Sequence, residues 1–276
     1  MKNTKKFAVV GHPIAHSKSP TIHNLFAAQF GIALEYRKFD FPSGCFKKEV
    51  DNLKKMGYFG LNITLPFKHE AYLYCEKLSE KVKQTSSVNT ITFKNDCAFG
   101  DTTDGIGLVK DLLLQGVKLS SSNILLLGAG GAAQGVLIDL LENQPMHLSI
   151  FNRTQEKAKN LVDAYQSEAQ KKNITLSVFD PNSNNFKFDL VINATSAGIL
   201  GDELFAPKNI FQSSAFFYDM TYGKDTAFLK AAKNCRAQFS DGLGMLVCQA
   251  AESFRLWHEG LEPNTLEVIN KLQKSF

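Results

Sequence analysis

Short apolar runs alternate with longer amphipathic segments along the whole chain. The runs are bounded by polar or turn residues, which is typical of strands, whereas apolar residues in the longer segments recur at helical spacing. In the first part we expect strands over residues 6–11, 35–41, 59–65 and 88–93, the last returning through a hairpin to 97–99. Helices are expected over residues 20–31, 43–57 and 67–77. This alternation predicts an α/β unit with a mixed sheet.

One of these helices, over residues 20–31, carries a signal at each end. Ser19 is the expected N-cap, Pro20 suits the first helical position, and Gly31 is a typical stop. The pattern therefore predicts the bounds of this helix closely.

The second part of the chain repeats the pattern of strand and helix. Strands are expected from Asn123, from His147, and over residues 176–179, 190–193, 216–220 and 237–240. The helices between them are expected over residues 132–141, 155–171 and 226–234. Right-handed crossovers would join these units into one parallel sheet. Further helices are expected over residues 106–115, 243–257 and 265–273.

A glycine-rich turn follows the strand that begins at Asn123. Gly128, Gly130 and Ala133 have the spacing of a dinucleotide-binding turn. The first small residue allows a tight turn, the second lets the backbone approach a pyrophosphate, and the third lets the helix pack on the strand. The unpaired N–H groups at the start of that helix would face the phosphates.

These patterns predict an α/β protein with two domains. An N-terminal α/β domain with a mixed sheet is expected over residues 1–104, completed by C-terminal helices over residues 242–276 that return to it. A Rossmann-type, doubly wound parallel-sheet domain is expected over residues 105–241. Because that domain would bind only the cofactor, the first domain is expected to bind the substrate.

The end of the second parallel strand indicates which dinucleotide is bound. An NAD site places an acidic residue there to hold the ribose hydroxyl, but this chain has Asn152, Arg153 and Thr154, followed by Lys157. A guanidinium binds phosphate well, and the neighbouring amide and hydroxyl can donate as well. We therefore predict NADP as the cofactor.

Composition excludes several other classes. The net charge of +4 comes from 31 basic and 27 acidic residues spread along the 276-residue chain, which does not favour nucleic acid. Five cysteines without regular spacing indicate reduced thiols. No signal or membrane-spanning pattern is found, so we expect a cytoplasmic protein without membrane contact. His12, His16 and His23 lie close together, but Pro13 breaks their spacing, so no metal is expected.

Polar residues gather at the ends of the expected strands in the first domain, where ligands bind in open α/β sheets. Lys68 is expected at the start of a helix, where a positive charge interacts unfavourably with the helix dipole. Its presence there therefore suggests another role. The four clusters are Ser17 to Ser19, Asn62 to Lys68, Ser87 to Thr90 and Asp101 to Gly105.

In their order, these segments resemble the shikimate dehydrogenase family over nearly the whole chain. The matching segments are Gly11 to Pro20, Asn62 to Lys68, Val88 to Thr90, Thr103 to Gly105, Gly128 to Ala132, Asn152 to Thr154, Asn193 to Gly198, Asp219 to Tyr222, and Asp241 through Met245 to Gln249.

The resemblance implies reversible reduction of 3-dehydroshikimate to shikimate with NADPH, in the route to chorismate and the aromatic amino acids. It implies that Lys68 and Asp104 act at the reacting carbonyl or hydroxyl, where an ammonium would stabilise the developing charge. The sequence leaves open which of the two is the formal acid or base, and whether the protein is a homodimer.

The resemblance also implies the binding residues. Those expected to contact shikimate or 3-dehydroshikimate are Ser17, Ser19, Thr64, Lys68, Asn89, Asp104, Tyr222 and Gln249, with the two serines and the Tyr222 phenol as the carboxylate cradle. Those expected to contact NADP are Gly128, Ala129, Gly130, Gly131, Ala132, Asn152, Arg153, Thr154, Lys157, Thr195, Met220 and Gly242.

Two positions depart from the family pattern, and two alternatives remain. Thr102 replaces a common Asn, which we expect to tune activity without abolishing it, and Lys157 replaces a common Arg. The first alternative is a quinate/shikimate dehydrogenase of broader substrate and cofactor range, for which Glu156 is the nearest acidic residue. The second is a catalytically silent NADP-binding regulator, against which the presence of both Lys68 and Asp104 argues.

Overall fold

The computed structural model describes residues 4–182, 187–195 and 206–274. Its contacts divide the chain into two compact units, residues 1–107 with 247–276, and residues 108–246. The expected boundaries after residues 104 and 241 differ from these. Both divisions fall inside continuous helices, α5 (Asp104–Leu114) and α10 (Leu243–Trp257), whereas the sequence marks only where each helix begins. We call the two parts unit 1 and unit 2.

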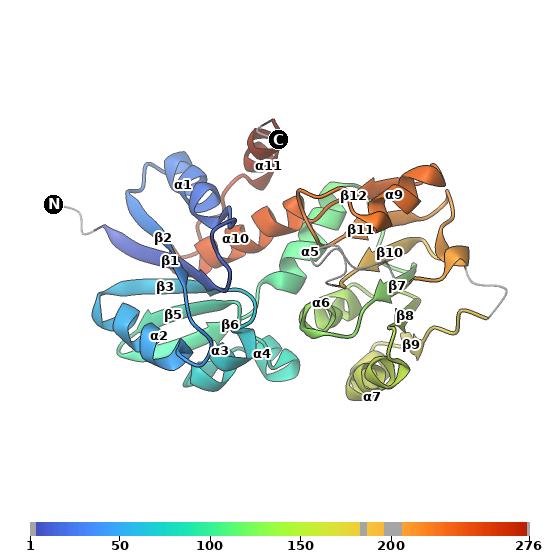
Figure 1. The fold of residues 1–276 in the computed structure, drawn as a ribbon, viewed down its shortest axis with the longest axis horizontal. Coiled ribbons are helices and arrows are strands. Elements are labelled where there is room, and N and C mark those ends of the chain that lie inside the picture. Colours follow the sequence, from blue (N-terminus) through green and yellow to red (C-terminus); the bar gives the residue numbers. More distant parts are fainter. Residues whose placement is uncertain (1–3, 183–186, 196–205, 275–276) are drawn as a thin grey trace. The chain divides into compact units, whose positions relative to one another are not determined.

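Unit 1 is built on a six-stranded mixed sheet (Figure 1). β1 pairs in parallel with β2 and β3, β5 runs antiparallel to β3 and β6, and β4 is parallel to β6. The strand order is β2-β1-β3-β5-β6-β4, and the sheet is mixed as predicted. The strands are β1 (Lys5–Gly11), β2 (Leu34–Asp40), β3 (Tyr58–Ile63), β4 (Lys77–Leu78), β5 (Thr90–Lys94) and β6 (Cys97–Asp101).

Alternate side chains of β1 bury against the two faces of this sheet. Ala8 and Val10 belong to a cluster with the apolar side of α2 (Phe46–Lys55) and with Ala71 of α3 (Lys68–Tyr74). Phe7 and Val9 belong to a cluster with Trp257 of α10. The opposite face is therefore covered by α10 together with α1 (Ser19–Gln29), and α11 (Thr265–Gln273) contacts α1, so the C-terminal helices return to unit 1 as predicted.

The local predictions for unit 1 need three corrections. Ser19 is not the N-cap of α1, because Lys18 holds that position and the Ser19 amide donates to the Ser17 hydroxyl. α2 and α3 are shorter than the expected 43–57 and 67–77. The two-residue strand β4 and the helix α4 (Glu80–Thr85) were not predicted, because segments this short are too brief to show a periodic pattern.

Unit 2 is built on a six-stranded, fully parallel sheet with the order β12-β11-β10-β7-β8-β9. This is the predicted doubly wound topology, with its switch point between β10 and β7. The strands are β7 (Asn123–Leu127), β8 (His147–Phe151), β9 (Thr175–Val178), β10 (Leu190–Asn193), β11 (Phe216–Asp219) and β12 (Gln238–Ser240).

Helices cover both faces of the unit 2 sheet, which explains its continuous apolar strands. Ile124 and Leu126 of β7 pack with α6 (Gly131–Glu142) and α7 (Gln155–Lys171). Leu125 and Leu127 pack in a second cluster with α9 (Ala227–Asn234). A single 3-10 turn, η1 (Lys208–Ile210), was not predicted.

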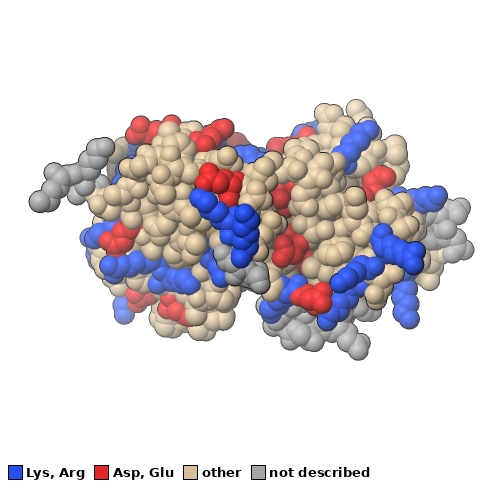
Figure 2. Space-filling model, turned by 90° about the horizontal axis from the view of Figure 1, so that it is seen from above, with Lys and Arg blue, Asp and Glu red and all other residues tan. Residues whose placement is uncertain are grey.

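Charge is distributed without one dominant sign on the face drawn in Figure 2, where Lys and Arg side chains alternate with Asp and Glu. Within the described part of the chain, every helix is too short or too polar to cross a bilayer.

Candidate functional site

Lys68 and Asp104 meet at one edge of the unit 1 sheet. Lys68 is the first residue of α3, just beyond β3, and Asp104 is the first residue of α5, just beyond β6. The Lys68 Nζ lies 2.7 Å from Asp104 Oδ2, and the two side chains are 24% and 8% exposed. The carboxylate also sits in the first turn of its helix, where the dipole favours a negative charge. The pair is therefore largely removed from solvent but still accessible at the lysine.

Asn89 holds the other oxygen of Asp104. It lies just before β5, and because β5 is antiparallel to β3 and β6, its start meets their ends at the same edge. Asn89 Nδ2 donates to Asp104 Oδ1 at 3.1 Å and to Gln249 Oε1 of α10 at 3.2 Å. The structure thus brings Lys68, Asn89, Asp104 and Gln249 together, as the resemblance implied.

The remaining predicted substrate residues fall into two groups. In unit 1, Ser17 and Ser19 are linked through their hydroxyls at 3.2 Å, and Thr64 follows β3 at the same edge as Lys68. A Cβ at Gly11 would lie 2.5 Å from the Thr64 methyl group. The end of β1 and Thr64 are therefore closely packed. Tyr222 belongs to unit 2, and burial raises the pKa of its phenol. Its membership of the carboxylate cradle stays a prediction.

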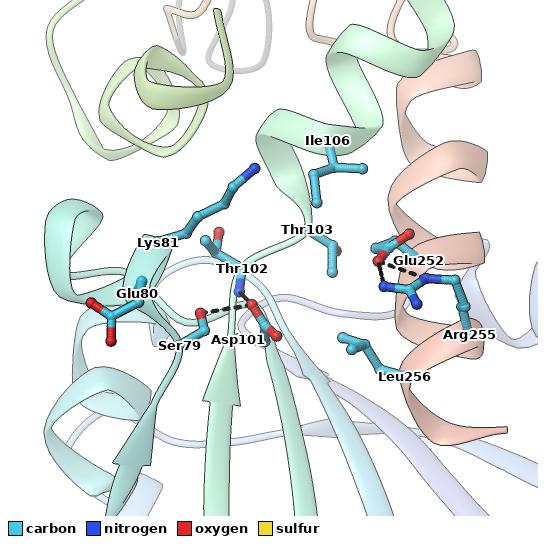
Figure 3. A pocket seen from close by; sticks show the side chains of 10 residues that line it. All are labelled: Ser79, Glu80, Lys81, Asp101, Thr102, Thr103, Ile106, Glu252, Arg255 and Leu256. Atoms are coloured by element: carbon cyan, nitrogen blue, oxygen red, sulfur yellow. Dashed lines mark hydrogen bonds and ion pairs between the residues drawn. The ribbon is translucent and has the colours of Figure 1, made fainter. Parts of the chain in front are cut away.

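Thr102, one of the two departures from the family pattern, lines a cavity of about 230 Å³ (Figure 3). Its side chain is buried, and its hydroxyl has no hydrogen-bond partner among the described residues. Lys81 reaches this cavity from α4 and Arg255 from α10, the latter paired with Glu252 (Figure 3). The neighbouring Thr103 instead donates its amide to Asn89 Oδ1 at 2.9 Å. The change at position 102 therefore leaves the hydrogen bonds of Asn89 intact.

In unit 2, the glycine-rich turn follows β7. Gly128 has a φ of +106°, and a Cβ there would lie 3.1 Å from the Ala194 carbonyl oxygen, so both conformation and space require glycine. A Cβ at Gly130 or Gly131 would meet open space. Ala133 is fully buried against the sheet. The turn therefore leaves an open approach to the first N–H groups of α6.

The segment expected to contact the adenosine phosphate follows β8. The Asn152 amide donates to the Thr154 carbonyl at 2.9 Å, so it shapes the turn. Arg153, Thr154 and Lys157 are exposed, and Lys157 lies in the first turn of α7. The cationic side chains are therefore accessible to an anionic ligand.

Three further predicted cofactor residues follow β10, β11 and β12. The Thr195 hydroxyl donates to Asn193 Oδ1 at 2.7 Å. A Cβ at Gly242 would overlap the Met220 carbonyl group, so the ends of β11 and β12 pack closely there. All predicted cofactor residues thus lie beyond carboxyl ends of the parallel strands. Gly198, at the end of one family segment, lies outside the described residues.

Sequence reasoning overlooked the buried polar network beneath the unit 1 site. His23, Tyr36, Asn62, Thr90 and Ser253 form hydrogen bonds with one another and reach Asn89. Asn62 and Thr90 lie in polar clusters that the sequence marked, and Ser253 lies four residues after Gln249, on the same helical face. No cluster of three or more His, Cys, Asp or Glu side chains suited to a metal ion occurs in the part of the chain that the structure describes.

The doubly wound sheet and its glycine-rich turn define unit 2 as a dinucleotide-binding domain, joined to a second α/β unit with a polar site. Family models match the chain over residues 9–91, described as the shikimate dehydrogenase substrate binding domain, over 111–225, described as shikimate / quinate 5-dehydrogenase, and over 242–273, described as the shikimate 5'-dehydrogenase C-terminal domain. The chain belongs to the shikimate dehydrogenase family.

Individual relatives match nearly the full chain. A protein of Methylobacillus flagellatus named shikimate dehydrogenase (NADP(+)) is 43% identical over 97% of this chain and 98% of its own length. An Ael1 enzyme from Pseudomonas putida has 37% identity and a TM-score of 0.89, with 98% of both chains covered.

The third relative was solved with both of its small molecules. Shikimate 5-dehydrogenase from Thermus thermophilus, in complex with NADP(H) and shikimate, has 29% identity and a TM-score of 0.87, covering 99% of this chain and 100% of that one. The predicted family and fold are confirmed, and the predicted oxidoreductase class and NADP cofactor agree with these relatives. The individual site residues stay predictions.

Proposed function

We propose that this protein catalyses the reversible, NADP-dependent interconversion of shikimate and 3-dehydroshikimate, working toward shikimate in the cell. The observation that carries this proposal is the Lys68–Asp104 pair, joined at 2.7 Å and supported by Asn89, which donates to both Asp104 and Gln249. A solvated surface pair would contribute little and would need no such support. Family membership then selects the substrate.

The proposed chemistry of unit 1 is proton transfer at the carbon that changes oxidation state. As negative charge develops on the carbonyl oxygen of 3-dehydroshikimate, the Lys68 ammonium stabilises it and donates a proton. In the reverse direction the neutral amine takes the hydroxyl proton. Asp104 orients the ammonium through the contact at 2.7 Å.

Recognition of the ring is assigned to the polar groups around that pair. Ser17 and Ser19 offer hydroxyls to the substrate carboxylate, and the Tyr222 phenol is proposed to complete this cradle. Thr64, Asn89 and Gln249 are assigned to the ring hydroxyls, for which their hydroxyl and amide groups can both donate and accept.

The residues of unit 2 fit NADP. The open backbone at Gly130 and Gly131 and the N-terminus of α6, whose first turn has no acidic residue, suit a diphosphate. Arg153, with Thr154 and Lys157, suits the 2′-phosphate. When bound, the nicotinamide supplies or accepts the hydride. The other residues assigned to this ligand are Ala129, Ala132, Thr195, Met220 and Gly242.

The first test follows nicotinamide absorbance when shikimate or quinate is added with NADP or NAD. We expect rapid reduction with shikimate and NADP alone. Comparable turnover with quinate or with NAD would instead identify the broader quinate/shikimate enzyme. Absence of turnover in every combination, with NADP still bound, would support the regulator and contradict the proposal.

The catalytic role of Lys68 is tested by Lys68→Ala. Loss of the ammonium should lower kcat by about 1000-fold, because the developing charge loses its partner and its proton donor. The affinity for NADP should stay unchanged. Lys271→Ala is the matched control, since it removes an exposed lysine paired with Glu267 on α11. An unchanged kcat in Lys68→Ala would refute this assignment.

A further inference from the structure

Ser253 is one of the polar contacts between α10 and the unit 1 sheet. Its side chain is fully buried, and its Oγ lies 2.9 Å from Asn62 Nδ2 of β3 and 2.8 Å from the Thr90 hydroxyl of β5. One turn further along α10, Trp257 donates its Nε1–H to the Ile91 carbonyl of β5 at 3.3 Å. Ser253 and Trp257 together therefore position α10 along the strands.

The direction of these hydrogen bonds follows from partners that can only donate or only accept. Asn62 Nδ2 also lies 3.4 Å from the Asn89 carbonyl, which can only accept, so this atom is the donor and Asn62 Oδ1 is the acceptor. Ser253 Oγ consequently accepts from Asn62. Tyr36 donates to Asn62 Oδ1 at 2.7 Å. The Asn62 side chain thus has its donor and acceptor atoms both engaged.

The hydrogen bonds of Thr90 and Asn89 connect Ser253 to the proposed site. Thr103 donates its amide to Asn89 Oδ1, which makes that atom an acceptor, and the Thr90 hydroxyl donates to it at 2.9 Å. Since Thr90 uses its one proton on Asn89, the single proton of Ser253 faces two acceptors, the Thr90 hydroxyl at 2.8 Å and the Gln249 carbonyl at 3.2 Å. The Asn89 amide is then left to donate to Asp104 and to Gln249, one helical turn before Ser253.

We propose that Ser253 is a positioning residue for substrate recognition. Together with Trp257 it holds α10 so that the side-chain amide of Gln249 meets that of Asn89, and it contacts the Thr90 hydroxyl that donates to Asn89. This inference rests on the proposed function, because it takes Asn89 and Gln249 as the groups that bind the ring hydroxyls. Ser253 itself contacts neither Lys68 nor Asp104 in the described structure, so its effect should fall on binding rather than on proton transfer.

A double-mutant cycle with Ser253→Ala and Gln249→Ala tests this role. We expect Ser253→Ala to weaken shikimate binding by calorimetry, and to raise KM, by about five- to tenfold, with kcat nearly unchanged, because a hydrogen bond of ordinary strength is lost. In the Gln249→Ala background the same change should cost less than about twofold. Ser122→Ala is the matched control: it truncates another buried serine, in unit 2, and should leave KM for shikimate unchanged.

A fully additive cycle, or a fall in kcat at unchanged KM, would overturn the proposal. A readout without ligand separates this failure from failure of the proposed function. The side-chain amide signals of Asn89 and Gln249 in nuclear magnetic resonance spectra, assigned from the Asn89→Ala and Gln249→Ala variants, should shift in Ser253→Ala. Unchanged signals would refute the positioning contact even if the wild-type protein binds shikimate, whereas wild-type protein that does not bind shikimate would refute the proposed function itself.

Discussion

His23 is a buried histidine that supports the framework of unit 1. Its ring stacks on Tyr36 with the ring centroids 4.5 Å apart, and its Nε2 lies 3.2 Å from Asn62 Oδ1. Because Asn62 Oδ1 is an acceptor, His23 Nε2 carries the proton of a neutral ring. Burial, opposed by the Asn62 hydrogen bond and reinforced by His258, lowers the pKa of His23 to about 3. The residue thus supports the network beneath the site in its uncharged form.

This burial predicts a loss of stability in mild acid. Between pH 6.5 and about 3, the unfolded state binds the His23 proton and the folded state does not, so the free energy of unfolding should fall as the pH falls through this window. At pH 5 this effect of His23 lowers the free energy of unfolding by about 2 kcal/mol. His258, whose pKa burial lowers to about 4, acts in the same direction.

Urea unfolding at pH 7 and pH 5 measures this effect. His23→Gln should show a smaller decrease in the free energy of unfolding between the two pH values than the wild-type protein. His16→Gln, which changes an exposed histidine, serves as the control. An equal decrease in wild type and His23→Gln would contradict the prediction.

Arg153 carries the predicted preference for NADP over NAD. Arg153→Ala should raise KM for NADP by about tenfold or more, since a charge-assisted contact to phosphate is lost, and should leave KM for NAD nearly unchanged. Steady-state kinetics with both cofactors measures the difference. Lys171→Ala removes an exposed cation at the far end of α7 and should change neither value. A parallel rise in both KM values would exclude a phosphate contact.

At the scale of elements, the start of α10 is built around a buried carboxylate from α5. The Tyr218 hydroxyl donates to Asp111 Oδ2 at 2.6 Å and accepts from the Met245 amide at 3.3 Å. A Cβ at Gly244 would overlap the Asp111 carboxylate. Gly244 therefore makes room for this group. Burial raises the pKa of the Asp111 carboxyl group.

Gly244→Ala should destabilise the protein, although alanine favours helices in general. Either Asp111 or the first turn of α10 must move, which we expect to cost about 2 kcal/mol or more. Thermal unfolding without ligand measures the change. Gly131→Ala, at a helical glycine facing open space, should be neutral or slightly stabilising. Equal melting temperatures for Gly244→Ala and wild type would show that the contact relaxes without cost.

At the scale of the whole molecule, the two units have separate sheets and separate cores, so we expect each ligand to protect its own set of amides. Hydrogen exchange measured by mass spectrometry should slow over residues 128–133 and 152–157 with NADP. With shikimate it should slow over residues 62–68 and 101–104. Each ligand alone serves as the control for the other. Protection by shikimate confined to unit 2 would contradict the assignment of the substrate to unit 1.

The sequence by itself determined the family, the order of most strands and helices and the NADP cofactor, and it predicted the substrate. Glycine spacing, strand periodicity and the basic segment at Arg153 are local signals, and local backbone and side-chain chemistry is readable along the chain. The helix over residues 155–171 was predicted to the residue for this reason, since its 17 residues hold several turns of apolar periodicity.

Tertiary structure decided what depends on residues far apart in sequence. The link from Ser253 to Asn62 and Thr90, the neutral state of His23 and the room that Gly244 leaves for Asp111 all arise from packing across many residues. The unit boundaries inside α5 and α10 have the same origin, because a continuous helix has no sequence break where its packing partners change. Contacts of this kind depend on three-dimensional proximity, which periodicity along the chain does not encode.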